Sequence, residues 1–153
     1  MNPPSENWST ERIIQSNAED AISLITEIVD QLRQRQWEEH DLFGIHLALE
    51  EAIMNAIKHG NAGDPAKQVD VRCELSGAHF EITVEDQGSG FDRSEVPDPT
   101  DEVNLEKESG RGLMLMEFYM SEVHYNEVGN RVRMAKNRGE EPSMSGGEQD
   151  DED

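Results

Sequence analysis

Apolar residues recur along the chain at two spacings, and each spacing predicts a different kind of element. A spacing of three and four positions predicts an amphipathic helix that is capped by Ser16 or Asn17 and ends near Gln36. The same spacing predicts a second helix over Glu39–His59. This helix should stop at Gly60, because glycine suits the left-handed conformation that ends many helices.

Strict alternation of apolar and polar residues predicts strands over residues 69–75 and 80–85, each with one face in the core. Ser76-Gly77-Ala78 fits a hairpin turn between them. A second hairpin should pair residues 122–128 with residues 131–136 across Gly129-Asn130. The remaining expected elements are a short strand at Ile13 and Ile14 and a short helix over residues 113–119.

Length and composition predict one domain in a chain of 153 residues. Residues 1–9 are polar and predict a flexible arm, and residues 10–137 form the domain. Residues 138–153 are acidic and almost free of apolar side chains, which predicts a disordered tail. The segment 87–110 is rich in Gly, Pro, Asp and Ser, and so long a segment with little regular structure is usually disordered or a functional lid.

The formal net charge of −21 changes the range of expected partners. A surface this negative repels nucleic acid and anionic membranes, so a protein partner with a basic surface is expected instead. No apolar run is long enough to cross a bilayer and the first residues do not resemble a signal peptide, so we expect a cytoplasmic protein. Cys73, the only cysteine, should point into the core.

Asp86 is the first candidate for chemistry. Strand parity places it on the same side as Phe80 and Val84, where a carboxylate is costly unless it receives hydrogen bonds. Gly88 and Gly90 follow at once and let the backbone turn sharply and approach a ligand. A buried acceptor beside such a turn suits an amino group like that of adenine. The alternative is that the strand ends at Val84 and Asp86 opens an ordinary turn.

Glu51 and Asn55 form a second candidate pair. They lie one helical turn apart on the same face and away from the apolar stripe of their helix. A carboxylate can act as a general base or orient a nucleophile, and an amide oxygen is a suitable ligand for Mg²⁺. The alternative is a solvated helix face, with which the neighbouring Glu50 and Lys58 agree.

A third candidate is the segment Ser109-Gly110-Arg111-Gly112-Leu113, directly before the last expected helix. Glycines there expose backbone N–H groups, and a helix N-terminus favours anions. Arg111 and Lys107 add positive charge, so the segment suits a polyphosphate. The alternative is a glycine-rich helix start with a surface arginine.

Taken in order, the three motifs resemble the nucleotide site of the GHKL superfamily, the Bergerat ATP-binding fold of DNA gyrase, sensor histidine kinases and mismatch-repair ATPases. Two sequence segments resemble those of the bacterial anti-sigma-factor serine kinases: LALEEAIMNAIKHGN at residues 47–61 and GRGLMLM at residues 110–116. The resemblance covers residues 11–136. It implies an α/β (α+β) two-layer sandwich, with a mixed, mostly antiparallel sheet covered on one face by helices.

The resemblance also implies a role for each motif residue. Asn55 would coordinate Mg²⁺, Glu51 would be the catalytic base or orienting group, and Asp86 would bind the adenine amino group. Residues 91–109 would form an ATP lid, and Gly110 and Gly112 would present amides to the phosphates. The full set expected to contact the nucleotide is Asn55, Asp86, Gly88, Gly90, Lys107, Gly110, Arg111, Gly112 and Leu113.

The implied activity is transfer of the γ-phosphoryl group of ATP to a serine of a small antagonist protein. The implied partners are that anti-sigma-factor antagonist and a sigma factor that the kinase sequesters, with a homodimer as a possible assembly. Glu108 stands where some members of the family carry an arginine before the second glycine motif. This departure favours the alternative of an ATP-dependent regulatory binding protein without significant phosphoryl transfer.

Overall fold

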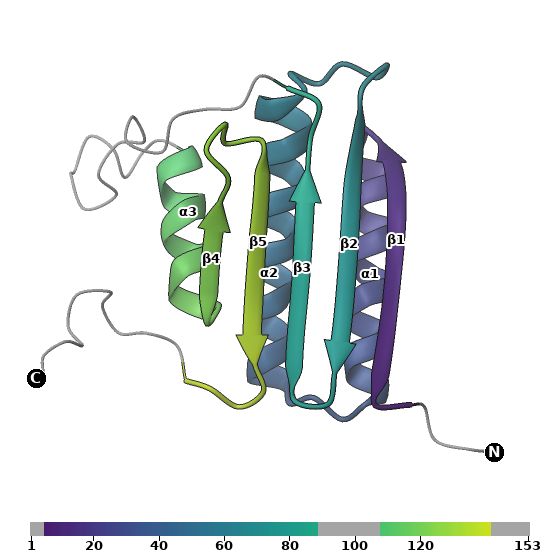
Figure 1. Ribbon diagram of the computed structural model, residues 1–153, viewed down its shortest axis with the longest axis vertical. Helices are drawn as coiled ribbons and strands as arrows, with labels where there is room; N and C mark the ends of the chain where they lie inside the picture. Colours follow the sequence, from purple (N-terminus) through teal and green to yellow (C-terminus); the bar gives the residue numbers. More distant parts are fainter. Residues whose placement is uncertain (1–4, 89–107, 142–153) are drawn as a thin grey trace, which may run out of the picture.

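The computed structural model describes residues 5–88 and 108–141, and it forms two layers (Figure 1). One layer is a five-stranded sheet in the order β1-β2-β3-β5-β4, and the helices lie on one of its faces. The elements are β1 Asn7–Gln15, α1 Ala18–Gln34, α2 Glu39–Asn55, the π-helical turn η1 Ala56–Gly60, β2 Gln68–Ser76, β3 His79–Glu85, α3 Glu108–Tyr119, β4 Glu122–Tyr125 and β5 Arg131–Asn137. The expected two-layer α+β sandwich is confirmed.

All four strand pairings of the described sheet are antiparallel, so the expectation of a mixed sheet is wrong for this part of the chain. The first strand is longer than expected. All nine residues of β1 pair with β2, from Asn7 opposite Ser76 to Gln15 opposite Gln68. The flexible arm predicted over residues 1–9 is therefore wrong from Asn7 onward, because backbone pairing along β2 orders even these polar residues.

The helices follow the apolar spacing closely. Asn17 caps α1, since its side-chain oxygen accepts a hydrogen bond from the Asp20 amide at 2.8 Å. Helix α2 begins at Glu39 as expected and continues into η1, which ends at Gly60. Gly60 does not adopt the left-handed conformation that its position predicted; Ala62 and Gly63 adopt it two and three residues later, with φ of 54° and 69°.

The core lies between the sheet and the helices. Strands β2 and β3 bury alternate residues, and α1 and α2 bury their apolar stripes against them. Its largest fully buried side chains include Phe80, Ile82, Ile28, Leu32, Ile45, Leu49, Ile53 and Met116. Cys73 is 1% exposed, which confirms its inward orientation, and burial raises the pKa of its thiol far above the ordinary value.

The other face of the sheet carries charged side chains. Arg72 of β2 lies 3.2 Å from the Glu11 carboxylate of β1, and Arg133 of β5 lies 3.4 Å from Glu81 and 3.2 Å from Glu122. Arg72 stands directly opposite Glu11, whereas Arg133 reaches both of its carboxylate partners diagonally across the sheet. These pairs are exposed, so each contributes little to stability.

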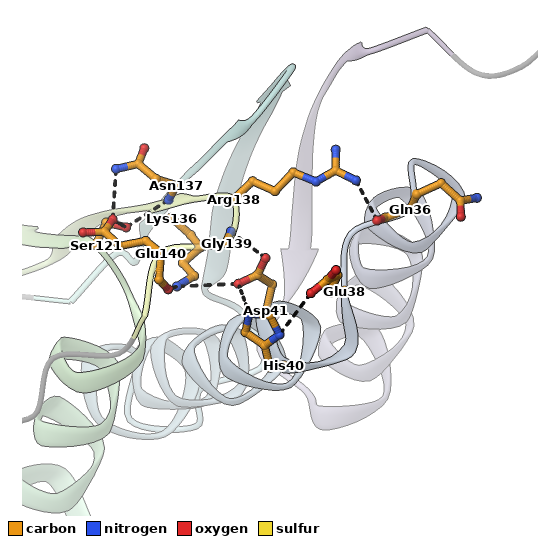
Figure 2. A network of polar contacts seen from close by, with 10 residues as sticks. All are labelled: Gln36, Glu38, His40, Asp41, Ser121, Lys136, Asn137, Arg138, Gly139 and Glu140. Carbon is orange, nitrogen blue, oxygen red and sulfur yellow. Dashed lines mark hydrogen bonds and ion pairs between the residues drawn. The ribbon is translucent and has the colours of Figure 1, made fainter.

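A network of polar groups, of which Asp41 and Lys136 are buried, holds the segment after β5 against the start of α2 (Figure 2). The Asp41 carboxylate, 1% exposed, accepts a hydrogen bond from the Gly139 amide at 2.8 Å and lies 3.7 Å from Lys136 Nζ. The Arg138 guanidinium donates to the carbonyls of Arg35 and Gln36 at the end of α1. We call these residues, with Glu140, the Asp41 network.

The Asp41 network corrects one prediction. The tail was predicted to be disordered from residue 138, but residues 138–141 are described and fastened to the α1–α2 corner. The remainder of the predicted tail, residues 142–153, lies outside the described residues. Within the described ranges no helix is long and apolar enough to cross a membrane.

Candidate functional site

Glu51 and Asn55 lie on α2 and are half-buried, whereas Leu49 and Ile53 of the same helix are completely buried. The predicted separation of the pair from the apolar stripe is therefore confirmed.

Helix α3 faces this side of α2. A methyl group built on Gly112 would lie 2.0 Å from Glu51 Oε1, and one built on Gly44 would lie 2.9 Å from Tyr119 Cδ1. The two contacts are seven residues apart on each helix and run in opposite order along the chain. The helices are therefore antiparallel and in close contact, and the same register sets Asn55 level with residue 108, the first residue of α3.

The second glycine motif was expected directly before the last helix, and this placement is wrong. Helix α3 begins at Glu108, so Gly110 and Gly112 both lie inside it. The first four amides of a helix have no partner within it, which leaves the amide of Gly110 available to an anion but commits that of Gly112 to the helix. Gly112 packs closely against Glu51, and a methyl group at this position would require the Glu51 carboxylate to move.

Asp86 follows directly after β3, and its carboxylate lies on the helix side of the sheet. A methyl group built on Gly60, at the end of η1, would lie 2.1 Å from Asp86 Oδ2. The predicted inward direction of Asp86 is thus confirmed. Burial is the largest influence on this carboxyl and raises its pKa, while the hydrogen bond from the Gly88 amide to Oδ1, 2.8 Å long, opposes the shift.

The ordinary turn that stood as the alternative is also present, because the hydrogen bond from Gly88 to Asp86 closes a turn of that kind. What is unusual is its closeness to η1. A methyl group on Gly88 would lie 1.8 Å from the carbonyl oxygen of Gly60. Two glycines from distant parts of the sequence therefore let two backbones touch beside a half-buried carboxylate.

Two asparagines without a predicted role also belong to this site. Asn61 is completely buried and accepts a hydrogen bond from the Gln87 amide at 2.8 Å. Asn130 lies in the turn before β5; its carbonyl accepts from the Asp86 amide at 2.9 Å and its side chain donates to the Asp86 carbonyl. All three bonds join segments far apart in the sequence, so no local pattern could have indicated them.

The remaining predicted site residues are distributed as follows. Leu113 is 9% exposed and packs in the hydrophobic core. Gly110 and Arg111 lie in the first turn of α3. Gly90, Lys107 and the predicted lid up to residue 107 lie outside the described residues, while residues 108 and 109 of that lid belong to α3. Within residues 5–88 and 108–141 no three His, Cys, Asp or Glu side chains form a metal-binding group.

Comparison with known proteins agrees with this geometry. Residues 14–136 match the family of histidine kinase-like ATPase domains. An anti-sigma F factor from Oceanobacillus iheyensis is 33% identical over 102 residues, which cover 63% of this chain and 69% of the relative. A serine-protein kinase RsbW from Bacillus licheniformis is 34% identical over 103 residues, covering 63% of this chain and 64% of the relative.

A solved structure shares the fold. The crystal structure of the RsbU and RsbW domains of a Mycobacterium tuberculosis protein superposes with a TM-score of 0.60 at 17% identity, over 90% of this chain and 35% of that one. The fold and the site define a histidine kinase-like ATPase domain. The chain belongs to this family and, within it, to the anti-sigma-factor kinases.

Proposed function

We propose that the protein binds ATP with Mg²⁺, phosphorylates a small antagonist protein on serine or threonine, and sequesters a regulatory partner such as a sigma factor. The observation that carries the proposal is the antiparallel contact of α2 with α3. It sets Glu51 against Gly112 and Asn55 level with the first residue of α3. A carboxylate and an amide thus flank a helix N-terminus, where phosphate oxygens are favoured.

Each residue would have a distinct task at this site. Asp86 would accept a hydrogen bond from the adenine amino group, and the amides of the first turn of α3 would donate to phosphate oxygens. The bound nucleotide would supply the γ-phosphoryl group, and its Mg²⁺ would neutralise part of the phosphate charge. The side-chain oxygen of Asn55 suits a Mg²⁺ ligand that acts together with phosphate oxygens. Glu51 would orient the attacking hydroxyl and accept its proton.

The test measures phosphate transfer from radiolabelled ATP to the cognate antagonist. Glu51→Ala should lower the transfer rate by ~10²-fold or more, because a positioned base contributes about that much. Glu50→Ala is the matched control, since Glu50 is the preceding residue on α2 and its carboxylate lies 3.8 Å from His46 on the exposed side. Absence of transfer by the wild type, or equal rates for the wild type and Glu51→Ala, would contradict the kinase proposal.

One observation favours a second candidate, an ATP-dependent binding protein without significant transfer. Helix α3 begins with an acidic residue, Glu108, at the end where the phosphates would lie. A carboxylate there competes with them for the positive end of the helix. Capture of the partner with and without ATP separates the candidates. Under this second proposal Glu51→Ala keeps nucleotide-dependent capture and regulation of the partner, while Asn55→Ala or Asp86→Asn loses both.

A further inference from the structure

Asn61 is a polar side chain with 0% exposure, and described residues satisfy it. Its Nδ2 donates to Ser16 Oγ and to the Gln68 carbonyl, both at 3.0 Å, and its Oδ1 accepts from the Gln87 amide at 2.8 Å. Because a carbonyl only accepts and an amide N–H only donates, these partners fix the orientation of the side-chain amide. Asn61 therefore has one position and one orientation.

Three of these groups close a ring. The Gln87 amide donates to Asn61, Asn61 donates to the Gln68 carbonyl, and the Gln68 amide donates to Gln87 Oε1 at 2.7 Å. Gln87 stands between Asp86 and Gly88, so the ring holds the turn that carries the half-buried carboxylate. The start of β2 supplies the third member.

The backbone of Asn61 belongs to the other half of the site. Its amide donates to the Ala56 carbonyl at 2.8 Å and so completes the π-helical turn that follows Asn55. Asn130 holds Asp86 from the side of β5 through two hydrogen bonds. Asn61 thus connects the Asp86 turn to the helix that carries Glu51 and Asn55. The turn and the end of that helix are also in close backbone contact at Gly60 and Gly88.

We propose that Asn61 is a positioning residue, which sets the Asp86 carboxylate relative to α2 and thereby determines the preference of the site for adenine. This rests on the proposed function, in which Asp86 accepts a hydrogen bond from the adenine amino group. Asn61 itself is buried and acts through the Gln87 amide. If Asn61 had only a structural role, its substitution would lower the affinity for all nucleotides equally. If it positions Asp86, its substitution lowers the affinity mainly for nucleotides that are recognised through Asp86.

The experiment measures by calorimetry the dissociation constants of ATP and of ITP, whose base has a carbonyl in place of the adenine amino group. The wild type should prefer ATP. Asn61→Ala should raise the dissociation constant for ATP about tenfold and that for ITP less than twofold, because a displaced acceptor costs only the nucleotide that uses it. Asp41→Asn is the matched control, because Asp41 is also buried and hydrogen-bonded but lies at the other end of α2. It should lower the melting temperature and leave the ATP-to-ITP preference unchanged.

The outcomes separate the inference from the proposed function. If the wild type binds no ATP, the proposed function fails first. Suppose that the wild type prefers ATP and that Asn61→Ala keeps this preference in full, or loses affinity for ATP and ITP equally. The positioning role of Asn61 is then overturned, while the proposed function stands. Should Asn61→Ala fail to fold, Gln87→Ala decides, since Gln87 is exposed and its loss opens the ring. A preference reduced about threefold supports the proposal, and an unchanged preference overturns it.

Discussion

The two ends of helix α2 carry polar groups in different states. At its start, Asp41 is completely buried, accepts from the Gly139 amide and lies beside the buried ammonium of Lys136 (Figure 2). Beyond its end, Asp86 is only half-buried, and its pKa is raised because burial outweighs the hydrogen bond from Gly88.

The difference concerns compensation of charge. A buried charge with an opposite charge beside it is stable in the folded protein, and removal of either partner leaves the other without compensation. A carboxylate whose burial is not fully compensated keeps the capacity to bind a further donor. The start of α2 thus contributes stability, and the region beyond its end contributes an acceptor, so substitutions should separate the two effects.

The largest effect on stability is expected for Asp41→Ala. It leaves Lys136, 3% exposed, without its buried partner, and should lower the free energy of unfolding by about 3–5 kcal/mol. Chemical denaturation measures this, and nucleotide affinity below the transition should be unchanged. The double variant Asp41→Leu/Lys136→Met should recover most of the loss. A loss of ATP affinity in Asp41→Ala would remove the distinction between the two ends.

The next effect is expected at the other end. Gly88→Ala would place a methyl group 1.8 Å from the Gly60 carbonyl oxygen, a backbone atom that cannot yield, so the Asp86 turn must move. We expect ATP affinity to fall by about 10²-fold, or ~2.7 kcal/mol. Gly77→Ala is the control, because it strains a different turn: Gly77 has a φ of 57° and lies between β2 and β3. That variant should lose some stability and keep ATP binding; equal affinities for both variants would refute the prediction.

A smaller effect should follow from Arg138→Ala in the Asp41 network. The variant loses hydrogen bonds of 2.9 Å and 2.6 Å to the carbonyls of Arg35 and Gln36, and the packing of the guanidinium 5.4 Å from the Trp37 ring centre. Because Arg138 is exposed, the free energy of unfolding should fall by only about 1 kcal/mol. Denaturation curves test this, and Arg138→Lys should recover little because an ammonium cannot reach both carbonyls in the same geometry.

The smallest effect is a gain in stability from Asp86→Asn without nucleotide. The pKa of the Asp86 carboxyl is raised in the folded protein. The protonated carboxyl therefore contributes stability below the ordinary aspartate pKa of about 3.9, and this contribution is lost as the pH rises through the pKa of the folded state. At neutral pH the ionised group therefore opposes folding. The variant should melt roughly 1–3 °C above the wild type at pH 7 and lose this advantage towards pH 4. An advantage that grows on acidification would contradict the assignment.

Local pattern predicted those parts of the molecule that depend on local forces. Helices α1 and α2, strands β2 and β3 and the inward direction of Cys73 and Asp86 follow from residue spacing alone. The extent of β1 did not, because Asn7 and its neighbours are polar and are ordered by pairing with β2. The start of α3 was not predicted, because glycines usually mark turns. In this helix Gly112 lies in close contact with the Glu51 side chain, a tertiary contact that the sequence does not show.

The connections between distant segments could not be predicted. Asn61 joins residues 16, 68 and 87, and Asp41 joins the start of α2 to the segment after β5. In a sequence, each is a polar residue near a helix end, where polar residues are common. Only the tertiary arrangement distinguishes them from caps or solvated residues.

The π-helical turn Ala56–Gly60 makes the length of this segment as important as its composition. A π turn takes one residue more per hydrogen bond than an α turn, so it changes the angular phase of everything that follows. Removal of one residue between Asn55 and Asn61 would allow the turn to relax to an ordinary α-helix. Each residue corresponds to about 100° of rotation, so Asn61 would no longer point towards Gln87. The exposed Lys58 and His59 should therefore tolerate substitution, whereas the segment should tolerate no deletion.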